Sequence, residues 1–428
     1  MTLNILLLCN KPGEGSAANT ISDHIDAIVH YSSHNVWLHS TIGDISNKLD
    51  LHKFDAIIVH YSLSIISDYF LSKSAKQRLR AYNGLKIVYA QDEYRQINKM
   101  VEELAFLRTD VLFSCFPAHE LDKIYCPQKL PSLAKYNNLT GYVPARLLSQ
   151  AHLAPIHNRP VHVGYRGRKL PYWYGELAYE KWSIVDKWQQ CPAAQSLHVN
   201  LSYNEKDRIY GAQWLDFLLS CKATLGVESG ASVMDFTGEL EACIDKHQLT
   251  YPKDSFQRVQ EKYLRDHEGK HQLNQISPRC FEAIALKTVL VLYEGEYSGI
   301  LVPERHYIAL KKDFSNIDHV VACLKDDDYL QHMADVAYQE IALNEQYSYQ
   351  TFMKKCDEII ELELAQRQKS VVAAGYDVGQ FERDCKHRSF FKKIVQRAMS
   401  IYQKSPPSMR LLIRVCFRLT TAFKMITR

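Results

Sequence analysis

Short, uninterrupted apolar runs alternate with polar segments of helix length along most of the chain. The first run, LNILLLCN, leads through the loop KPGEGSAANT into a helical pattern that begins at Ile21. Three more runs follow in the first third of the sequence: FDAIIVHYS, GLKIVYAQDE and TDVLFSCFP. A strand covered on both faces is apolar throughout, so such runs separated by helices predict βαβ units and a parallel sheet.

The pattern weakens over 146–160, RLLSQAHLAPIHNRP, whose prolines and histidines are typical of a linker. It resumes with five strand-like runs, VHVGYRGR, SLHVNLS, KATLGVES, TVLVLYEG and HYIALKKD, interrupted by a long insertion over 231–273. The 428 residues exceed one ordinary core and suit two domains of roughly 150–200 residues. We therefore expect an α/β fold of two Rossmann-like, doubly wound domains, 1–155 and 156–345. They would face a cleft in which ligands bind beyond the carboxyl ends of the strands.

Composition sets the broad class of protein. A hydrophobic content of 46% with 23% charged residues is that of a soluble globular protein. The N-terminal apolar run is short and has no basic region before it, so we interpret it as a strand and not a signal peptide. No uncharged run reaches the roughly 20 residues that a membrane-spanning helix needs. The 11 cysteines are odd in number and form no CxxC pair, which favours a reduced, cytoplasmic compartment.

The net charge of +4 conceals a segregated C-terminal tail. Residues 386–428 contain eleven Lys or Arg and no Asp or Glu, which leaves 41 basic against 48 acidic residues in the remainder. The basic positions recur at helical spacing in an apolar background, which predicts two amphipathic helices on an anionic membrane surface. The alternative is a helix pair docked on the acidic body of the same chain. Nucleic acid is not expected as a partner, because no known motif is present and the body is acidic.

The segment NQISPRCFEAIALKT, residues 274–288, combines a helix start with charged groups. Ser277 suits the N-cap and Pro278 the first helical position. The helix N-terminus is then an anion site, and Arg279 adds a positive charge beside it. A carboxylate one turn into the helix, Glu282, could accept hydrogen bonds from ribose hydroxyls. The other interpretation is an ordinary capped helix with a solvated Arg–Glu pair.

In its context, SPRCFEAIALKTVLVLYEGEYSGIL resembles the C-terminal half of GT-B glycosyltransferases, close to the group-1-like enzymes of bacterial surface-polysaccharide assembly. The resemblance covers about 159–345 and is only architectural over the first 150 residues. Lys287 stands where a glycine is more usual. Many relatives carry E-x7-E, and Glu282 matches the second glutamate, which the family uses on the nucleotide ribose. Asn274 stands in place of the first.

The resemblance also implies roles for other residues on the donor side of the cleft. In GYRGRKLPYWYGELAYEK, an Arg and a Lys would neutralise the donor diphosphate without a metal, with the choice between the two arginines left open. Loops after later strands would face the donor sugar. The expected donor-binding residues are Arg166, Arg168, Lys181, Glu228, Ser229, Lys270, Asn274, Arg279, Glu282 and Glu294. An inverting enzyme needs a base from the first domain, and the candidates are Asp92 and Glu93, with Asp23 and His24 behind them.

Two motifs are interpreted as coincidences. HEGKH (267–271) matches the H-E-x-x-H zinc signature, but Gly269 and Lys270 in its middle oppose the regular helix that this site needs. KDDDYL (325–330) falls between two helical segments and is expected to cap the second one. No metal or other cofactor is expected.

The sequence thus predicts a metal-independent GT-B glycosyltransferase that moves a sugar from a nucleotide-sugar donor to a lipid-linked or growing bacterial surface glycan. A helix within 346–385 would cross back to the first domain, as in that fold. The protein would lie on the inner face of the cytoplasmic membrane, bound through 386–428. Two alternatives stay open. One is another GT-B nucleotide-sugar enzyme, an epimerase or a phosphorylase; the other is a non-catalytic glycan-binding subunit, which Asn274 would allow.

Overall fold

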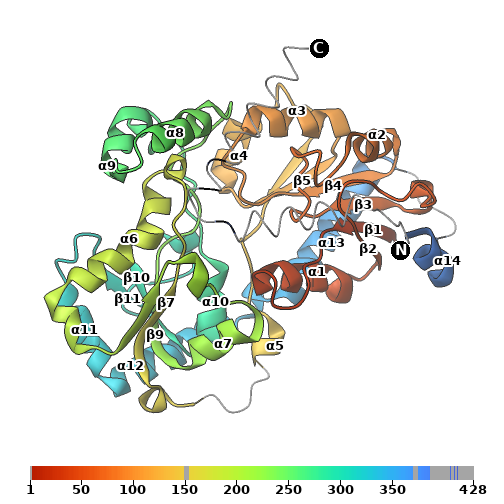
Figure 1. Ribbon diagram of the computed structural model, residues 1–428. Coiled ribbons are helices and arrows are strands. Elements are labelled where there is room, and N and C mark those ends of the chain that lie inside the picture. The colour runs from red at the N-terminus through yellow and green to blue at the C-terminus, as the bar shows by residue number, and fades with distance from the viewer. Residues whose placement is uncertain are drawn as a thin grey trace.

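The computed structural model describes residues 2–148, 154–369 and 375–385, together with Ser405, Met409 and Leu412. The predicted membrane tail, 386–428, therefore lies outside the described residues except at those three positions. The described part forms two α/β domains side by side (Figure 1).

The first domain is built on a six-stranded, all-parallel sheet of order β2-β1-β3-β4-β5-β6. The four apolar runs predicted as strands form its interior, where nearly every residue is buried. The two edge strands, β2 and β6, are partly exposed and so lack a continuous apolar run, which is why the pattern did not reveal them. The strands are β1 Asn4–Cys9, β2 Asn35–Ser40, β3 Ala56–Val59, β4 Leu85–Tyr89, β5 Val111–Ser114 and β6 Ala134–Asn137.

Helices cover both faces of this sheet. Its helices are α1 Asn19–Tyr31, α2 Lys73–Ala81, α3 Ile97–Leu107 and α4 Ala118–Ile124, and the short helix α5 Ala145–Leu148 that follows packs on the core of the second domain. A long helix from the far end of the chain, α13 Tyr349–Gln366, packs beside α1 on the same sheet face (Figure 1). Asp357 of α13 accepts hydrogen bonds from Ser32 and Ser33 just after α1. A last described helix, α14 Val378–Cys385, adds Phe381 to the core on the opposite face.

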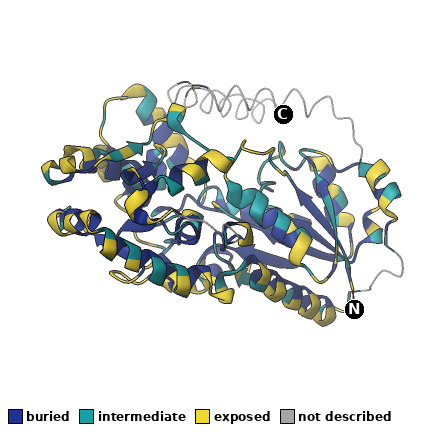
Figure 2. Ribbon diagram, turned by 90° about the horizontal axis from the view of Figure 1, so that it is seen from below, coloured by how far each residue is buried: buried dark blue, intermediate teal, exposed yellow. Residues whose placement is uncertain are grey.

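The second domain repeats the design with a five-stranded parallel sheet of order β11-β10-β9-β7-β8. All five predicted strands are present: β7 Val161–Arg166, β8 Val199–Ser202, β9 Cys221–Gly226, β10 Val289–Tyr293 and β11 Tyr307–Leu310. The helices are α6 Glu176–Gln190, α7 Gly211–Leu219, α8 Glu239–Thr250, α9 Phe256–Val259, α10 Pro278–Ala285, α11 Ile317–Lys325 and α12 Asp327–Ala337. The expected α/β class, with two doubly wound domains, is confirmed. The inner strands are almost fully buried, whereas the edge strand β8 is partly exposed, as are the outward helix faces (Figure 2).

The insertion between β9 and α10 carries α8 and α9 and forms a separate buried cluster with the segment around α6, in which Phe256 packs with Tyr172 and Trp182. HEGKH lies after these helices in turns, and His271 contacts Glu120 of the first domain at 2.9 Å. Its two histidines do not share a helix face, and the described residues contain no cluster of three potential metal ligands. In KDDDYL, Asp326 caps α12 by accepting a hydrogen bond from the Tyr329 N–H.

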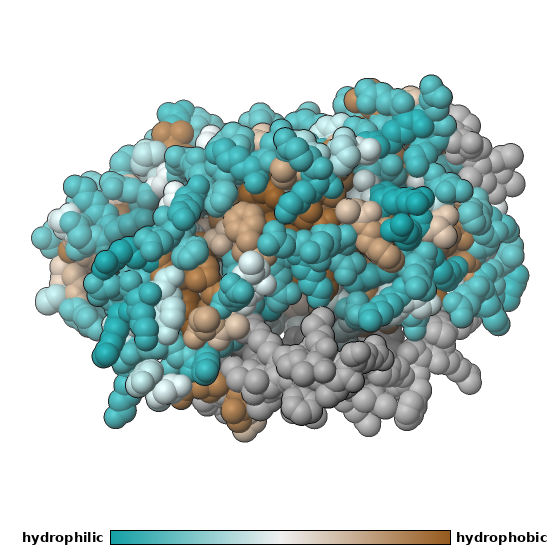
Figure 3. Space-filling view, turned by 90° about the horizontal axis from the view of Figure 1, so that it is seen from above, coloured by the Kyte–Doolittle hydropathy of each residue, from teal (hydrophilic) through white to brown (hydrophobic). Residues whose placement is uncertain are grey.

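The face seen in Figure 3 is mainly hydrophilic, with hydrophobic residues gathered in recesses toward its middle. Within the ranges given above, no helix is both long enough and apolar enough to cross a membrane.

Candidate functional site

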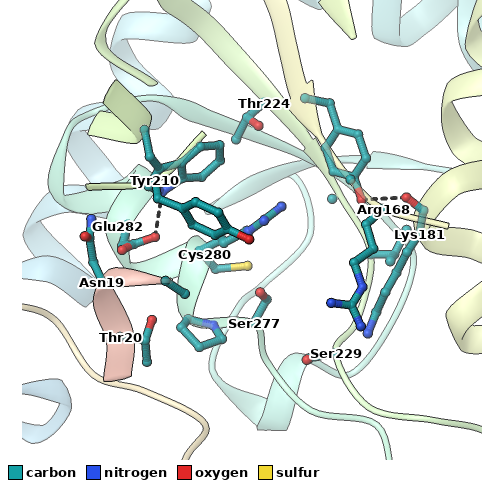
Figure 4. A pocket seen from close by; sticks show the side chains of 18 of the residues that line it. Asn19, Thr20, Arg168, Lys181, Tyr210, Thr224, Ser229, Ser277, Cys280 and Glu282 are labelled. Atoms are coloured by element: carbon teal, nitrogen blue, oxygen red, sulfur yellow. Dashed lines mark hydrogen bonds between the residues drawn. The ribbon is translucent and has the colours of Figure 1, made fainter. Parts of the chain in front are cut away.

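A pocket of about 520 Å³ lies between the two domains, beyond the carboxyl ends of both sheets. The first domain contributes the start of α1 and the segments that follow β3 and β4. The second contributes the ends of β7 and β9, the start of α7 and the first turn of α10 (Figure 4). Parallel strands place their carboxyl ends along one edge, so both sheets direct their loops into the same space.

The N-terminus of α10 forms one wall. Ser277 occupies the N-cap with an extended backbone, and its side chain makes no capping hydrogen bond. Pro278 stands at the first helical position, where its missing N–H costs nothing. Although the Cys280 N–H already donates to the Ser277 carbonyl at 2.9 Å, the positive end of the helix dipole faces the pocket and favours an anion there.

Three cationic side chains line the pocket near this turn. Arg168 follows β7, Lys181 lies on α6 and Arg279 is the second residue of α10. The Nζ of Lys181 donates to the Gly230 carbonyl at 3.3 Å, and burial lowers the pKa of Lys181 to about 8. The Arg279 guanidinium packs 4.9 Å from the Trp214 ring centre and donates to the Arg166 carbonyl oxygen. Concentrated positive charge at a helix N-terminus suits a phosphate group.

Glu282 lies across the pocket from Arg168 and Lys181 (Figure 4). Its side chain is buried, and the Trp214 indole N–H donates to one carboxylate oxygen at 2.8 Å. Burial raises the pKa of Glu282 to about 7, although the bond from Trp214 lowers it. A carboxylate held in this way can accept hydrogen bonds from ligand hydroxyls.

Of the ten expected donor-binding residues and the two leading base candidates, six line the pocket: Asp92, Arg168, Lys181, Ser229, Arg279 and Glu282. The other six do not line it: Glu93, Arg166, Glu228, Lys270, Asn274 and Glu294. Each of these six has an identifiable alternative environment.

Arg166 faces the outside of the sheet end. Its guanidinium lies 4.2 Å from the Phe217 ring centre and donates to the Asn200 carbonyl and side-chain oxygens, each at 2.9 Å. Between the two arginines that the sequence left open, Arg168 is the one on the pocket wall.

Glu228 and Asn274 bind each other beneath the pocket. The Asn274 amide donates to Glu228 at 2.7 Å, and the other Glu228 oxygen accepts the N–H groups of Glu296 and Tyr297. The sequence predicts contacts from both residues to the donor sugar; instead, their hydrogen bonds hold the loop after β10 in place. Lys270 and Glu294 are exposed on surface turns.

The candidate bases separate clearly. Glu93 points into the first-domain core and binds Ser114 and Tyr125. Asp23 is paired with Arg146 at 2.8 Å, and His24 is buried against His60 at 3.0 Å. Asp92 is exposed at the pocket edge and adopts a left-handed backbone, φ 56°. Among the four, only Asp92 lines the pocket.

Sequence reasoning missed several pocket residues. Trp214 was concealed in GAQWLDFLLSC, where it looks like one more core position of α7. Arg208 and Tyr210 precede that helix in the stretch RIYG, and Gly211 takes a positive φ of 59° there. The sequence signal that could have revealed them is a basic and an aromatic residue, Arg208 and Tyr210, just before the glycine that starts a helix. Tyr61 and Ser62 follow β3 and carried no recognisable signal.

No protein-family model and no curated protein sequence matches the chain. It is similar to the solved structure of an alpha-glucosyltransferase in complex with UDP and a 13-mer DNA, at 12% identity and a TM-score of 0.45, over 84% of this chain and 99% of that one. It is similar to an alpha1,3-fucosyltransferase at 10% identity and a TM-score of 0.42, over 84% and 90%. It is also similar to Anabaena Alr3699/HepE in complex with UDP, at 10% identity and a TM-score of 0.42, over 85% and 100%. At these identities the similarity is one of overall fold.

Proposed function

We propose that the protein is a glycosyltransferase that moves a sugar from a nucleotide-sugar donor to a hydroxyl group of a glycan acceptor. One observation carries the proposal. Arg168, Lys181 and Arg279 gather at the N-terminus of α10 in the same interdomain pocket as the buried carboxylate of Glu282. This combination fits a nucleoside diphosphate, with phosphate oxygens at the cations and ribose hydroxyls at the carboxylate.

The reaction would use charge and position without a metal. The bond from the sugar carbon to the diphosphate oxygen breaks and the acceptor oxygen forms a bond to that carbon, while the three cations at the α10 N-terminus neutralise the departing diphosphate. An acceptor hydroxyl entering from the first domain would lose its proton to Asp92, which is the candidate base on that wall. Donor binding belongs to the second domain and acceptor binding to the first.

For the acceptor, we propose a lipid-linked or growing bacterial surface glycan, such as O-antigen, capsule or lipopolysaccharide. It rests on the basic, apolar-spaced sequence of 386–428, which suits the anionic inner face of a cytoplasmic membrane. A transferase bound there would meet an acceptor that is held in the same membrane.

The test is a thermal-shift screen against UDP-, GDP-, dTDP-, ADP- and CMP-sugars without added metal. A ligand at 100 times its Kd stabilises the folded state by about 2.7 kcal/mol. We expect one nucleotide to stand out and its shift to disappear in Glu282→Ala. If no nucleotide sugar shifts the protein, the transferase is excluded and a glycan-binding subunit takes its place. If the donor binds but only free nucleotide and an altered sugar appear, an epimerase is indicated; release of a sugar 1-phosphate from a glycan and inorganic phosphate would indicate a phosphorylase.

A further inference from the structure

The segment that carries Asp92, residues 92–98, runs from the loop after β4 into the first turn of α3 and is held by both domains at once. Asp92 and Gln96 both adopt left-handed backbone conformations, with φ of 56° and 53°. Such conformations are unfavourable for residues other than glycine and persist only where the surroundings fix them. The contacts of this segment identify those surroundings.

On the first-domain side, the anchor is Glu93. Its carboxylate accepts hydrogen bonds from the Ser114 hydroxyl at 2.7 Å and the Cys115 N–H at 3.2 Å, and from the Tyr125 hydroxyl. All four residues are buried. This explains why Glu93 faces away from the pocket while its neighbour Asp92 lines it.

On the second-domain side, the partner is residues 235–241, within the first part of the insertion. The Asp235 N–H donates to the Tyr94 carbonyl at 2.8 Å, and the Asn98 N–H donates to the Phe236 carbonyl at 3.0 Å. The Ile97 N–H completes the bridge by donating to the Asp235 carbonyl at 3.4 Å. The two domains therefore share a short stretch of parallel backbone pairing.

An ion pair reinforces this pairing. Arg95 binds Glu241 at 2.9 Å, and the Glu241 side chain is fully buried while Arg95 is 39% exposed. Asp235 fixes the geometry of Glu241, because its carboxylate accepts the N–H groups of Gly238 at 2.7 Å and Glu241 at 2.9 Å. A buried carboxylate is costly to leave without a cation, so this contact favours one relative position of the two domains.

Apolar packing surrounds the pair. Ala231, Met234 and Leu273 of the second domain belong to the same buried cluster as Tyr94 and Ile97 of the first. The hydrophobic core of the first domain thus continues across the boundary at this point. His271 adds a further link to buried Glu120.

We propose that residues 231–241 form an interdomain clasp that positions the catalytic base, with Arg95, Asp235 and Glu241 as positioning residues for Asp92. This inference rests on the proposed transferase function. Asp92 would reach its place in the pocket only while the donor domain is docked on 92–98. Donor binding itself would not depend on the clasp, because the diphosphate and ribose contacts all lie within the second domain.

The rate of amide hydrogen exchange tests whether the clasp forms. The amides of Ile97, Asn98 and Asp235 donate hydrogen bonds across the domain boundary, so they should exchange slowly while the clasp is intact. The variants are Arg95→Glu, the milder Glu241→Gln, and the exchange Arg95→Glu with Glu241→Arg. The matched control is Arg258→Glu, which breaks an ion pair with Asp254 inside the same insertion. We expect Arg95→Glu and Glu241→Gln to speed exchange at 94–98 and 235–241 by at least about tenfold. The control should leave this exchange unchanged.

The functional readout is nucleotide release from the donor identified in the screen. Turnover should fall at least about tenfold in Arg95→Glu while the Kd for the nucleotide stays within about twofold, and the charge exchange should restore turnover. Unchanged hydrogen exchange in both single variants would overturn the clasp. Faster exchange with normal turnover would show a clasp that does not position Asp92, and would also overturn the proposal. If the wild-type protein binds no nucleotide sugar, the proposed transferase function fails, independently of the hydrogen-exchange result for the clasp.

Discussion

The indole N–H of Trp214 donates to the buried carboxylate of Glu282 at 2.8 Å, joining α7 to α10 at the back of the pocket. The face of the same indole supports Arg279, whose guanidinium lies 4.9 Å from the ring centre. Trp214 thereby orients both a carboxylate and a cation, the two charge types that a nucleoside diphosphate requires.

Glu282→Gln should change how stability depends on pH. Burial raises the pKa of Glu282 from its ordinary 4.5 to about 7, so its contribution is fully present below pH 4.5 and is lost as pH rises through 7. A glutamine avoids that loss. We expect Glu282→Gln to gain up to about 3 kcal/mol relative to the wild type between pH 4.5 and 8. Denaturant unfolding at pH 5 and pH 8 measures the difference, and a constant gap at both values would contradict it.

Donor affinity should be greatest between about pH 7 and 8. Glu282 is ionised above its pKa of about 7, and Lys181 is charged below its pKa of about 8. Affinity should therefore decline as pH falls below 7 and as it rises above 8. Calorimetric titration from pH 5.5 to 9 tests this. Glu282→Gln should remove the acidic decline and Lys181→Met the alkaline one; a flat profile in the wild type would exclude both assignments.

Arg168→Ala and Arg166→Ala should have opposite consequences. Arg168 lines the pocket, so its loss should weaken donor binding by about 10- to 100-fold with little effect on stability. Arg166 packs on Phe217 and binds Asn200, so its loss should cost about 1–3 kcal/mol of stability and leave affinity nearly unchanged. Melting temperature and nucleotide Kd, measured on both variants, separate the two roles. The reverse result would assign the diphosphate to Arg166.

Asn274→Glu should destabilise the protein increasingly as pH rises. Asn274 donates to Glu228 at 2.7 Å, and a glutamate there would place a second carboxylate beside a buried one. Like charges this close disfavour ionisation, so the variant should lose about 2–4 kcal/mol at pH 8 and less at pH 5. Asn274→Glu with Glu228→Gln is the matched control and should recover most of the loss. Equal melting temperatures for Asn274→Glu and the wild type at pH 8 would contradict the assigned contact.

His24 and His60 should stay neutral in one tautomeric form. The Ser62 N–H donates to His60 Nδ1 at 3.0 Å, so His60 must carry its proton on Nε2 and donate it to His24 Nδ1 at 3.0 Å. Burial lowers the pKa of His24 to about 3 and that of His60 well below its usual range. Nitrogen-15 NMR should show two Nε2-protonated rings from pH 5 to 8. Protonation of either ring in that range would disprove the arrangement.

The sequence determined the fold because burial on both sheet faces forces continuous apolar runs. Eight of the eleven strands are such runs. The partly exposed edge strand β8 was predicted as well, while β2 and β6 were not, because partial exposure interrupts their apolar residues. It also determined the start of α10, since Ser277, Pro278 and Glu282 act through helix geometry, which is local.

Only the tertiary structure decided which charged residues share the pocket. Arg166 and Arg168 are two residues apart, yet the end of β7 directs one to the outside and the other to the cleft. Glu93 and Asp92 are adjacent, yet Asp92 lines the pocket while Glu93 points into the core, where it accepts a buried hydrogen bond from Ser114. Glu228 and Asn274 lie beneath the pocket because they form a hydrogen bond with each other, although they are 46 residues apart along the chain. The direction of a side chain at a strand end depends on contacts with distant segments, and the local sequence pattern does not reveal those contacts.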